Sequence, residues 1–308
     1  MIELNRILCP IDFSEYSTRA LRYAARIALW SRAELRVLHV MPLLPPSTSS
    51  SLAEVGRLLT ERNLNAAIEN VRTADLKVTG ELVESGDAAT AILEQAEAFD
   101  ADLVITGSHG RSGVARAMLG SVVEVLLHKC RRPMLAVPSH CDPTRLDSTI
   151  TMREIVCAVD FAAASLTGLA YALSIAEEAD AHLTLLHVIE VPPELLSRPE
   201  PPYGTVDVEA VRAEAEADAL SRLRKLVPQH ARDYCTIETS VLEGGVSRQV
   251  LRLAQDRHAD LIAIGVHGRN ALDLAIFGSN SKDILRHACC PVLIVPAGPL
   301  RTPLRRAS

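Results

Sequence analysis

Gly107-Ser108-His109-Gly110 begins a stretch that runs on through nine residues to Gly120-Ser121. The same spacing returns in Gly265-Val266-His267-Gly268, which is followed nine residues later by Gly278-Ser279. Each copy follows an apolar run typical of a buried strand, ADLVIT or ADLIAI, and ends where a helical pattern begins. A strand, a glycine loop and a helix start can hold a phosphate, because glycine lets the backbone approach an anion and the first helical N–H groups lack partners. A single glycine turn also occurs without a ligand, but two copies with one spacing predict a phosphate or nucleotide site.

Composition narrows the class of protein. The chain has 308 residues, of which 48% are apolar, enough for two domains with separate cores. The net charge of −6 does not favour binding to nucleic acid or to an anionic membrane. No apolar run is long enough to span a bilayer. The opening residues lack the apolar core of a signal peptide, and the seven cysteines show no CxxC spacing. We therefore expect a cytoplasmic protein with reduced thiols, in which Cys9 and Cys157 pack in the core.

The first half of the chain alternates strands with helices. Apolar runs predict strands, and helical spacing of apolar residues between them predicts helices. Ser14 is expected to cap the first of these helices. Alternation of this kind indicates a parallel sheet that is covered on both faces. The expected strands are 5–11, 33–41, 76–84, 101–106 and 134–137, and the expected helices follow Ser14 and occupy 52–73, 88–99 and the residues after Ser121.

The order restarts at Arg153, where REIVCAVDF repeats the earlier NRILCPIDF. AHLTLLHVIE repeats AELRVLHVMP, and ACCPVLIVPAG repeats CRRPMLAVPSH. An insertion separates the second strand of the second copy from its glycine loop, and it comprises a proline-rich stretch at 192–203 and a long acidic helix at 206–227. The repeat predicts a first domain at 1–138, a linker at 139–152, a second domain at 153–297 and a tail at 298–308.

These motifs resemble the universal stress protein family in its tandem, two-domain form. Both copies satisfy the family signature G-x2-G-x9-G-[ST], and CPIDFSEYS, the His-Val pair ending the second strand and RRPMLAVP agree with it. The resemblance covers nearly the whole chain apart from the linker and the tail. It implies two doubly wound α/β domains, each with a five-stranded parallel sheet of order 3-2-1-4-5. It also implies ATP, with or without Mg²⁺, or another adenine nucleotide at the ends of strands one and four, where the strand order reverses.

The resemblance also implies which residues hold the nucleotide. Asp12 would meet the ribose or the adenine, and Val40 would offer backbone groups to the adenine edge. Arg111 could reach a phosphate from the loop, beside His109. The residues implied for ribose and phosphates are Gly107, Gly110, Gly120, Ser121 and Val122. The matching residues of the second copy are Asp160, Val188, Gly265, His267, Gly268, Arg269, Gly278, Ser279 and Asn280.

The two copies differ near the first-strand aspartate. Ser14-Glu15-Tyr16-Ser17 becomes Ala162-Ala163-Ala164-Ser165, which removes polar groups beside Asp160. The longer loop of the second copy could cover or block its pocket. We therefore expect the first domain to bind adenine nucleotide more tightly than the second.

The motifs do not indicate a dedicated enzyme. The loops lack the lysine of a GK[ST] phosphate loop, and neither a Ser/His/Asp set nor a metal-spaced His/Cys cluster emerges from the sequence. His109 and His267 could act as acid–base groups or simply fill the loop, and Asp12 and Asp160 could be catalytic, bind ligand or cap a helix. Three functions stay open: a nucleotide-binding stress-response protein, a slow ATPase or nucleotide-transferring enzyme, and a nucleotide-free scaffold.

The last strand of each copy, MLAVP or VLIVP, would lie at an edge of its sheet in the family order. An apolar edge leaves backbone donors and acceptors unpaired and favours pairing with another strand. We expect the two copies to pair within one chain in part through Leu135–Val137 and Leu293–Val295, as a pseudo-twofold. Further association of two chains into a homodimer is not fixed by the sequence.

Overall fold

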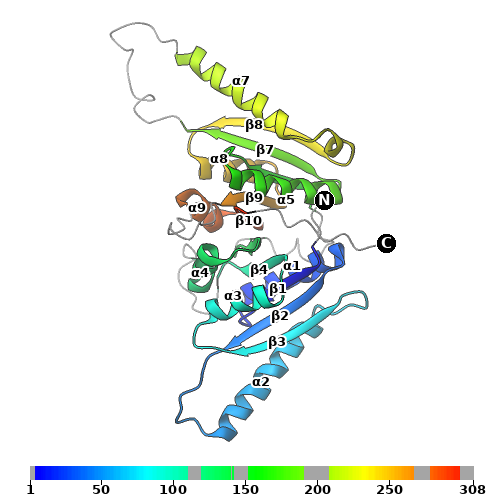
Figure 1. Cartoon of the computed structure of the whole chain (residues 1–308), viewed down its shortest axis with the longest axis vertical. Helices are drawn as coiled ribbons and strands as arrows, with labels where there is room; N and C mark the ends of the chain where they lie inside the picture. Colours follow the sequence, from blue (N-terminus) through cyan, green and yellow to red (C-terminus); the bar gives the residue numbers. More distant parts are fainter. Residues whose placement is uncertain are drawn as a thin grey trace, which may run out of the picture.

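The computed structural model describes residues 4–109, 119–139, 141, 152–190, 208–266 and 278–298. The first domain contains β1 to β5 and the second contains β6 to β10 (Figure 1). The first domain consists of β1 (Arg6–Pro10), α1 (Glu15–Ser31), β2 (Glu34–Met41), α2 (Ser50–Glu69), β3 (Val78–Glu84), α3 (Ala88–Ala98), β4 (Leu103–Gly107), α4 (Ser121–Lys129) and β5 (Met134–Val137). The second consists of β6 (Glu154–Ala158), α5 (Ala163–Ala179), β7 (His182–Ile189), α7 (Val208–Leu226), the 3-10 helix η2 (Gln229–Asp233), β8 (Thr236–Glu243), α8 (Val246–Asp256), β9 (Leu261–Val266), α9 (Ser279–His287) and β10 (Val292–Pro296).

Ten strands form one sheet in the order β3-β2-β1-β4-β5-β10-β9-β6-β7-β8. Within each domain all pairs are parallel, and the order is that expected, third-second-first-fourth-fifth. The predicted fold class is therefore confirmed. The order reverses between β1 and β4 in the first domain and between β6 and β9 in the second, and these switch points are where ligands bind in open α/β sheets.

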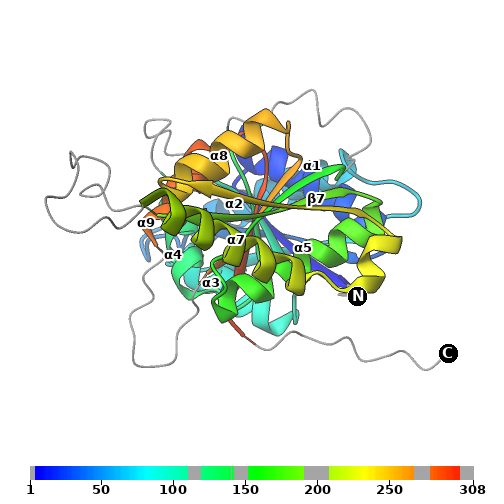
Figure 2. The same cartoon turned by 90° about the horizontal axis from the view of Figure 1, so that it is seen from above.

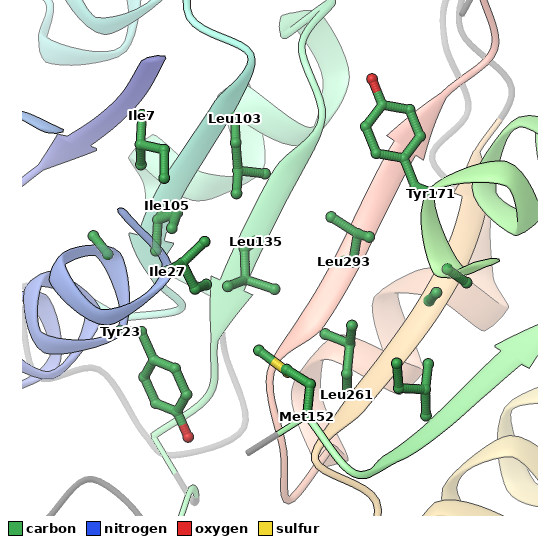
Figure 3. Packing of buried hydrophobic residues seen from close by; sticks show 14 of the residues in the cluster. Ile7, Tyr23, Ile27, Leu103, Ile105, Leu135, Met152, Tyr171, Leu261 and Leu293 are labelled. Carbon is green, nitrogen blue, oxygen red and sulfur yellow. The ribbon is translucent and has the colours of Figure 1, made fainter. Parts of the chain in front are cut away.

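The two domains join through their edge strands, which pair antiparallel. Met134, Leu135 and Ala136 lie opposite Ile294, Leu293 and Val292 respectively. Edge pairing within the chain was predicted, and the observed register begins one residue earlier on each strand than expected. Figure 3 shows Leu135 and Leu293 on these adjacent strands. We call this pair of strands the seam.

Two hydrophobic layers cover the sheet, because alternate strand residues point to opposite faces. Ile7 and Cys9 pack in one layer under α1, α2, α5 and α7, whereas Leu8 packs in the other with α3, α4, α8 and α9. Both layers continue across the seam, Leu293 in the first and Val292 in the second. Figure 2 shows α8 and α5 on opposite sides of β7. The core role predicted for Cys9 and Cys157 is consistent with their complete burial, which raises the pKa of both thiols.

Local side-chain chemistry sets several helix starts. Ser14 caps α1 as predicted, its Oγ accepting the N–H of Ser17 at 3.2 Å. The second helix starts two residues earlier than expected, because Ser49 accepts the N–H of Leu52 and so caps it within the serine cluster. It also ends earlier, at Glu69. The long helix of the insertion is present as α7.

Candidate functional site

A cavity of about 320 Å³ lies at the switch point of the first domain. The ends of β1, β2 and β4 and the start of α4 form its walls. Seven residues predicted for the first site line it: Asp12, Val40, Gly107, His109, Gly120, Ser121 and Val122. The other two predicted residues, Gly110 and Arg111, lie outside the described part of the chain.

Asp12 is held at the mouth of this cavity by the turn that starts α1. Its carboxylate accepts the backbone N–H of Ser14 at 3.0 Å and the Ser14 hydroxyl at 2.5 Å. Its own N–H donates to Ser17 Oγ at 3.3 Å, and Ser17 lines the cavity too. Ser14 therefore both caps the helix and orients the carboxylate. Sequence reasoning placed Ser14 and Ser17 near Asp12 but assigned neither to the site.

His39 is a further lining residue that the sequence identified only as a landmark of the second strand. Its Nδ1 lies 2.7 Å from the carbonyl oxygen of Ile11. Because a carbonyl only accepts, Nδ1 donates, and Nε2 of the neutral ring is the acceptor. The Phe13 ring packs on His39 at 4.3 Å between centroids, with the Phe13 backbone at a φ of 62°. His187 and Phe161 repeat this arrangement in the second domain.

The backbone of Val40 points toward the cavity. β1 ends at Pro10, opposite Leu38, whereas β2 continues to Met41. The Leu38 carbonyl accepts the N–H of Ile11, so it faces the β1 side. Residues two apart in a strand point their backbone groups to the same side. The N–H and C=O of Val40 therefore extend past the end of β1, and Val40 is one of the residues that line the cavity.

The first glycine of each motif, Gly107 or Gly265, is needed for helix packing as well as for the glycine loop. A Cβ added at Gly107 would lie 2.9 Å from the backbone oxygen of Tyr16, and one added at Gly265 would lie 2.1 Å from that of Ala164. The glycines therefore let α1 and α5 pack closely on β4 and β9. This requirement was not anticipated from the sequence, which attributed the motif glycines to anion approach.

The later glycines, Gly120 and Gly278, are the N-caps of α4 and α9. Neither helix start has a side-chain cap among the described residues. The first-turn N–H groups of α4, from Ser121 to Val123, have no partner within the helix and carry the positive end of its dipole. All three residues line the cavity. This end of the cavity is suited to an anion.

His109 lies beside Ser108 at the start of the loop. Its Nδ1 is 2.8 Å from Ser108 Oγ, and its ring centroid is 5.4 Å from that of Tyr16. Ser108 is fully buried. These neighbours hold the imidazole of His109 in place at the start of the loop.

The second domain has a cavity of about 640 Å³ at the equivalent place. Asp160, Val188, Gly265, Gly278 and Asn280 line it as predicted. Ser279 begins α9 but is not among the described lining residues, and His267, Gly268 and Arg269 lie outside the described part of the chain.

Two features distinguish the second cavity. Asp160 accepts the N–H of Ala162 at 2.9 Å, but the alanine has no hydroxyl to donate. The inserted helix α7 contributes Asp218 and Arg222, and β7 is followed by Glu190, which also lines the cavity. The Arg222 guanidinium lies 3.8 Å from the centroid of the Phe161 ring. Three carboxylates and one guanidinium therefore line the second cavity, whereas Asp12 is the one acidic residue among the described lining of the first.

The comparisons with known proteins agree with this architecture. The model of the universal stress protein family matches residues 3–138 and 151–296. The chain belongs to the universal stress protein family. A universal stress protein of Mycobacterium tuberculosis is 26% identical over 304 residues, which cover 94% of this chain and 96% of that protein. One from Mycolicibacterium smegmatis is 24% identical over 299 residues, with the same coverage of each chain.

Solved structures show the same fold. A universal stress protein from Archaeoglobus fulgidus aligns with a TM-score of 0.66 at 20% identity, covering 96% of this chain and all of that chain. The described part of this universal stress protein contains no helix long and apolar enough to cross a membrane. Within the same residues no three His, Cys, Asp or Glu side chains are grouped to hold a metal ion.

Proposed function

We propose that this chain is a cytoplasmic stress-response protein that binds adenine nucleotide, ATP in particular, and that the first cavity is its principal site. The observation that carries the proposal is the combination of groups around that cavity. An oriented carboxylate, an unpaired strand edge and an uncapped helix start meet in about 320 Å³. These match the hydroxyls, the base edge and the phosphates of a nucleotide respectively.

In the proposed pose each group does one task. The Asp12 carboxylate accepts from a ribose hydroxyl or the adenine amino group, and the Val40 backbone pairs with the adenine edge. The N–H groups at the start of α4 donate to phosphate oxygens. The glycine loop, with Gly110 and Arg111, would complete the phosphate contacts. Mg²⁺, where it accompanies ATP, would be held largely by the phosphates and water.

The first site is proposed to be the stronger of the two. Ser14 fixes the Asp12 carboxylate before any ligand arrives, and Ala162 offers Asp160 no equivalent bond. The acidic lining of the second cavity also opposes a polyanion. Binding rather than turnover is proposed, because the glycine loops lack the lysine of a GK[ST] phosphate loop.

The test begins with nucleotide released from freshly purified full-length chain, identified by mass spectrometry, followed by titration with ATP in a calorimeter. Gly120→Val should weaken binding about tenfold or more, because a side chain there would displace phosphate from the helix start. The backbone of Gly120, at φ −64° and ψ 143°, suits any residue, so the fold should survive. Gly278→Val is the matched change in the second site and should leave the tighter binding event intact.

The outcomes separate the three functions. A folded Gly120→Val variant with unchanged ATP affinity would refute the proposed pose. Absence of both co-purified nucleotide and binding heat would favour the scaffold. Steady turnover of labelled ATP that Gly120→Val abolishes would identify an enzyme instead.

A further inference from the structure

A third cavity, of about 1260 Å³, lies between the two domains. Its first-domain wall is α1 together with the residues that end α2. Its second-domain wall is the start of β6, the end of α5 and the start of β7. It lies at the amino ends of β6 and β7, whereas the nucleotide cavity of that domain lies at their carboxyl ends. The seam creates this cavity, because neither domain alone supplies both walls.

One face of α1 supplies a cationic and aromatic stripe to the cavity. Arg22, Arg26 and Trp30 follow one another at intervals of four residues, so they lie along one side of the helix. The side chains between them, such as Ala24 and Ala28, are buried in the core. Trp30 is 36% exposed, and it is the one tryptophan in the whole sequence. An aromatic ring left open at a domain junction suits an apolar ligand surface.

Both domains contribute arginines to the wall of this cavity. Among the described residues, the side chains of Arg22 and Arg153 have no hydrogen-bond or ion-pair partner. Other arginines on the same helices do have one, as Arg19 has with Glu15 and Arg57 with Glu61. A guanidinium binds carboxylate, sulfonate or phosphate oxygens through paired N–H groups. The cavity thus offers free donors for one acidic group.

The rest of the lining constrains where that acidic group lies. Glu178 and Asp180 contribute carboxylates at the end of α5, so an anion is favoured at the arginines rather than at the end of that helix. Ile27, Val71 and Met152 add apolar surface beside Trp30. Figure 3 labels Met152 and Tyr23 of α1, which belong to one buried hydrophobic cluster that spans the junction.

We propose that the interdomain cavity binds an amphiphilic anion, with an apolar body against Trp30 and an acidic head on Arg22 and Arg153. Such a ligand contacts both domains and holds them together across the face opposite the α4 and α9 layer. This site is separate from the proposed nucleotide sites, since the three cavities share no described lining residue.

The experiment uses decanoate as the probe and the emission of Trp30 in the full-length chain as the readout. Decanoate below its micelle concentration should shift the emission saturably. The Arg22→Gln/Arg153→Gln variant should bind about tenfold more weakly, the loss expected for a charge-assisted hydrogen bond. Arg57→Gln is the matched control, since Arg57 is on α2, pairs with Glu61 and is outside the cavity. Decanol, which lacks the acidic head, should bind wild type and the double variant alike.

Circular dichroism establishes that each variant is folded, and calorimetry repeats the titration independently of Trp30. Gly120→Val should bind decanoate as wild type does, because the first nucleotide cavity is elsewhere. Equal decanoate affinity in wild type and the double variant would overturn the proposed head-group contact. Non-saturable emission changes, or loss of binding in Gly120→Val, would overturn the location.

Discussion

Gly265→Ala should damage the second domain through packing rather than through its ligand. The added Cβ would lie 2.1 Å from the backbone oxygen of Ala164 and 2.3 Å from its carbonyl carbon. From the other side, a Cβ on Gly168 of α5 would lie 2.9 Å from the nitrogen of Gly265. Only backbone is met, so no side chain can rotate away. To restore an ordinary contact of 3.4 Å, α5 must withdraw from β9 by more than 1 Å.

Withdrawal of α5 opens its contact with β9, so the expected loss is at least about 3 kcal/mol, the upper end of the range for overpacking. The equivalent Gly107→Ala meets Tyr16 at 2.9 Å, and we expect about 1–2 kcal/mol there. Gly56→Ala is the control. Nothing lies within 4 Å of its added Cβ in the middle of α2, so the alanine should stabilise by about 0.5–1 kcal/mol.

Urea unfolding of the full-length chain measures these differences. Far-ultraviolet circular dichroism follows the secondary structure of both domains, and the urea midpoint of each variant measures its loss of stability. Gly265→Ala should lower the midpoint more than Gly107→Ala does, and Gly56→Ala should raise it slightly. A folded Gly265→Ala variant with a wild-type midpoint would refute the packing argument, as would equal losses at Gly265 and Gly107.

Two further predictions concern an ion cluster and the seam. The Arg132 side chain is 3% exposed and donates to Glu97 at 2.5 Å and to Asp100 at 2.9 Å. Arg132→Met should lower the free energy of unfolding by about 1–3 kcal/mol, less than for a fully buried ion pair because both carboxylates are half-exposed. Hydrogen bonding from Arg132 lowers the pKa of Glu97 below its ordinary 4.5. The loss of unfolding free energy in Arg132→Met, measured by urea unfolding, should therefore be full above pH 4.5 and become smaller below it. A loss that does not change with pH would contradict this origin. Leu293→Asp should loosen the seam and speed amide hydrogen exchange at residues 134–136, because Leu293 is 2% exposed and lies opposite Leu135. Leu52→Asp, at an exposed position of α2, is the control and should leave that exchange unchanged. Unchanged exchange in Leu293→Asp would count against the role of the seam.

Sequence patterns predict this fold well because they record which faces are buried. The alternation of apolar strands with helices predicted a parallel sheet in each copy, and the family resemblance implied the strand order. That order put the apolar strands with Leu135–Val137 and Leu293–Val295 at the sheet edges and so predicted the seam. Seven residues predicted for the first site line the first cavity, because each follows a strand or lies at a helix start, and their role in binding stays a prediction. His39 was noted only as a landmark because its place in the cavity depends on the Phe13 turn.

Other features depend on distances between segments far apart in sequence. The spacing G-x2-G-x9-G does not reveal that Gly265 packs against Ala164, since that contact is set by the approach of α5 to β9. The sequence located the inserted helix, but it did not indicate that Asp218 and Arg222 of that helix would line the second cavity. The interdomain cavity likewise follows from how the sheet continues through the seam, and no sequence pattern links Arg22, Arg26 and Trp30 of α1 to Arg153 in the opposite wall.

The hydroxyl of Ser14, which Ala162 lacks, both stabilises the start of its helix and orients the neighbouring aspartate. The two backbones are nearly the same, with φ and ψ of −71° and 162° at Ser14 and −77° and 158° at Ala162. The second domain has therefore kept the turn and lost only the hydroxyl. An alanine in place of serine at an N-cap typically costs about 1 kcal/mol, and here it also removes the 2.5 Å bond that orients the neighbouring aspartate. The closer packing of α5, where Gly168 faces Gly265, can offset the lost cap, but it cannot reorient Asp160. A helix can thus be kept stable by its far face after it has lost its cap, while the aspartate beside the helix start has one hydrogen-bond donor fewer.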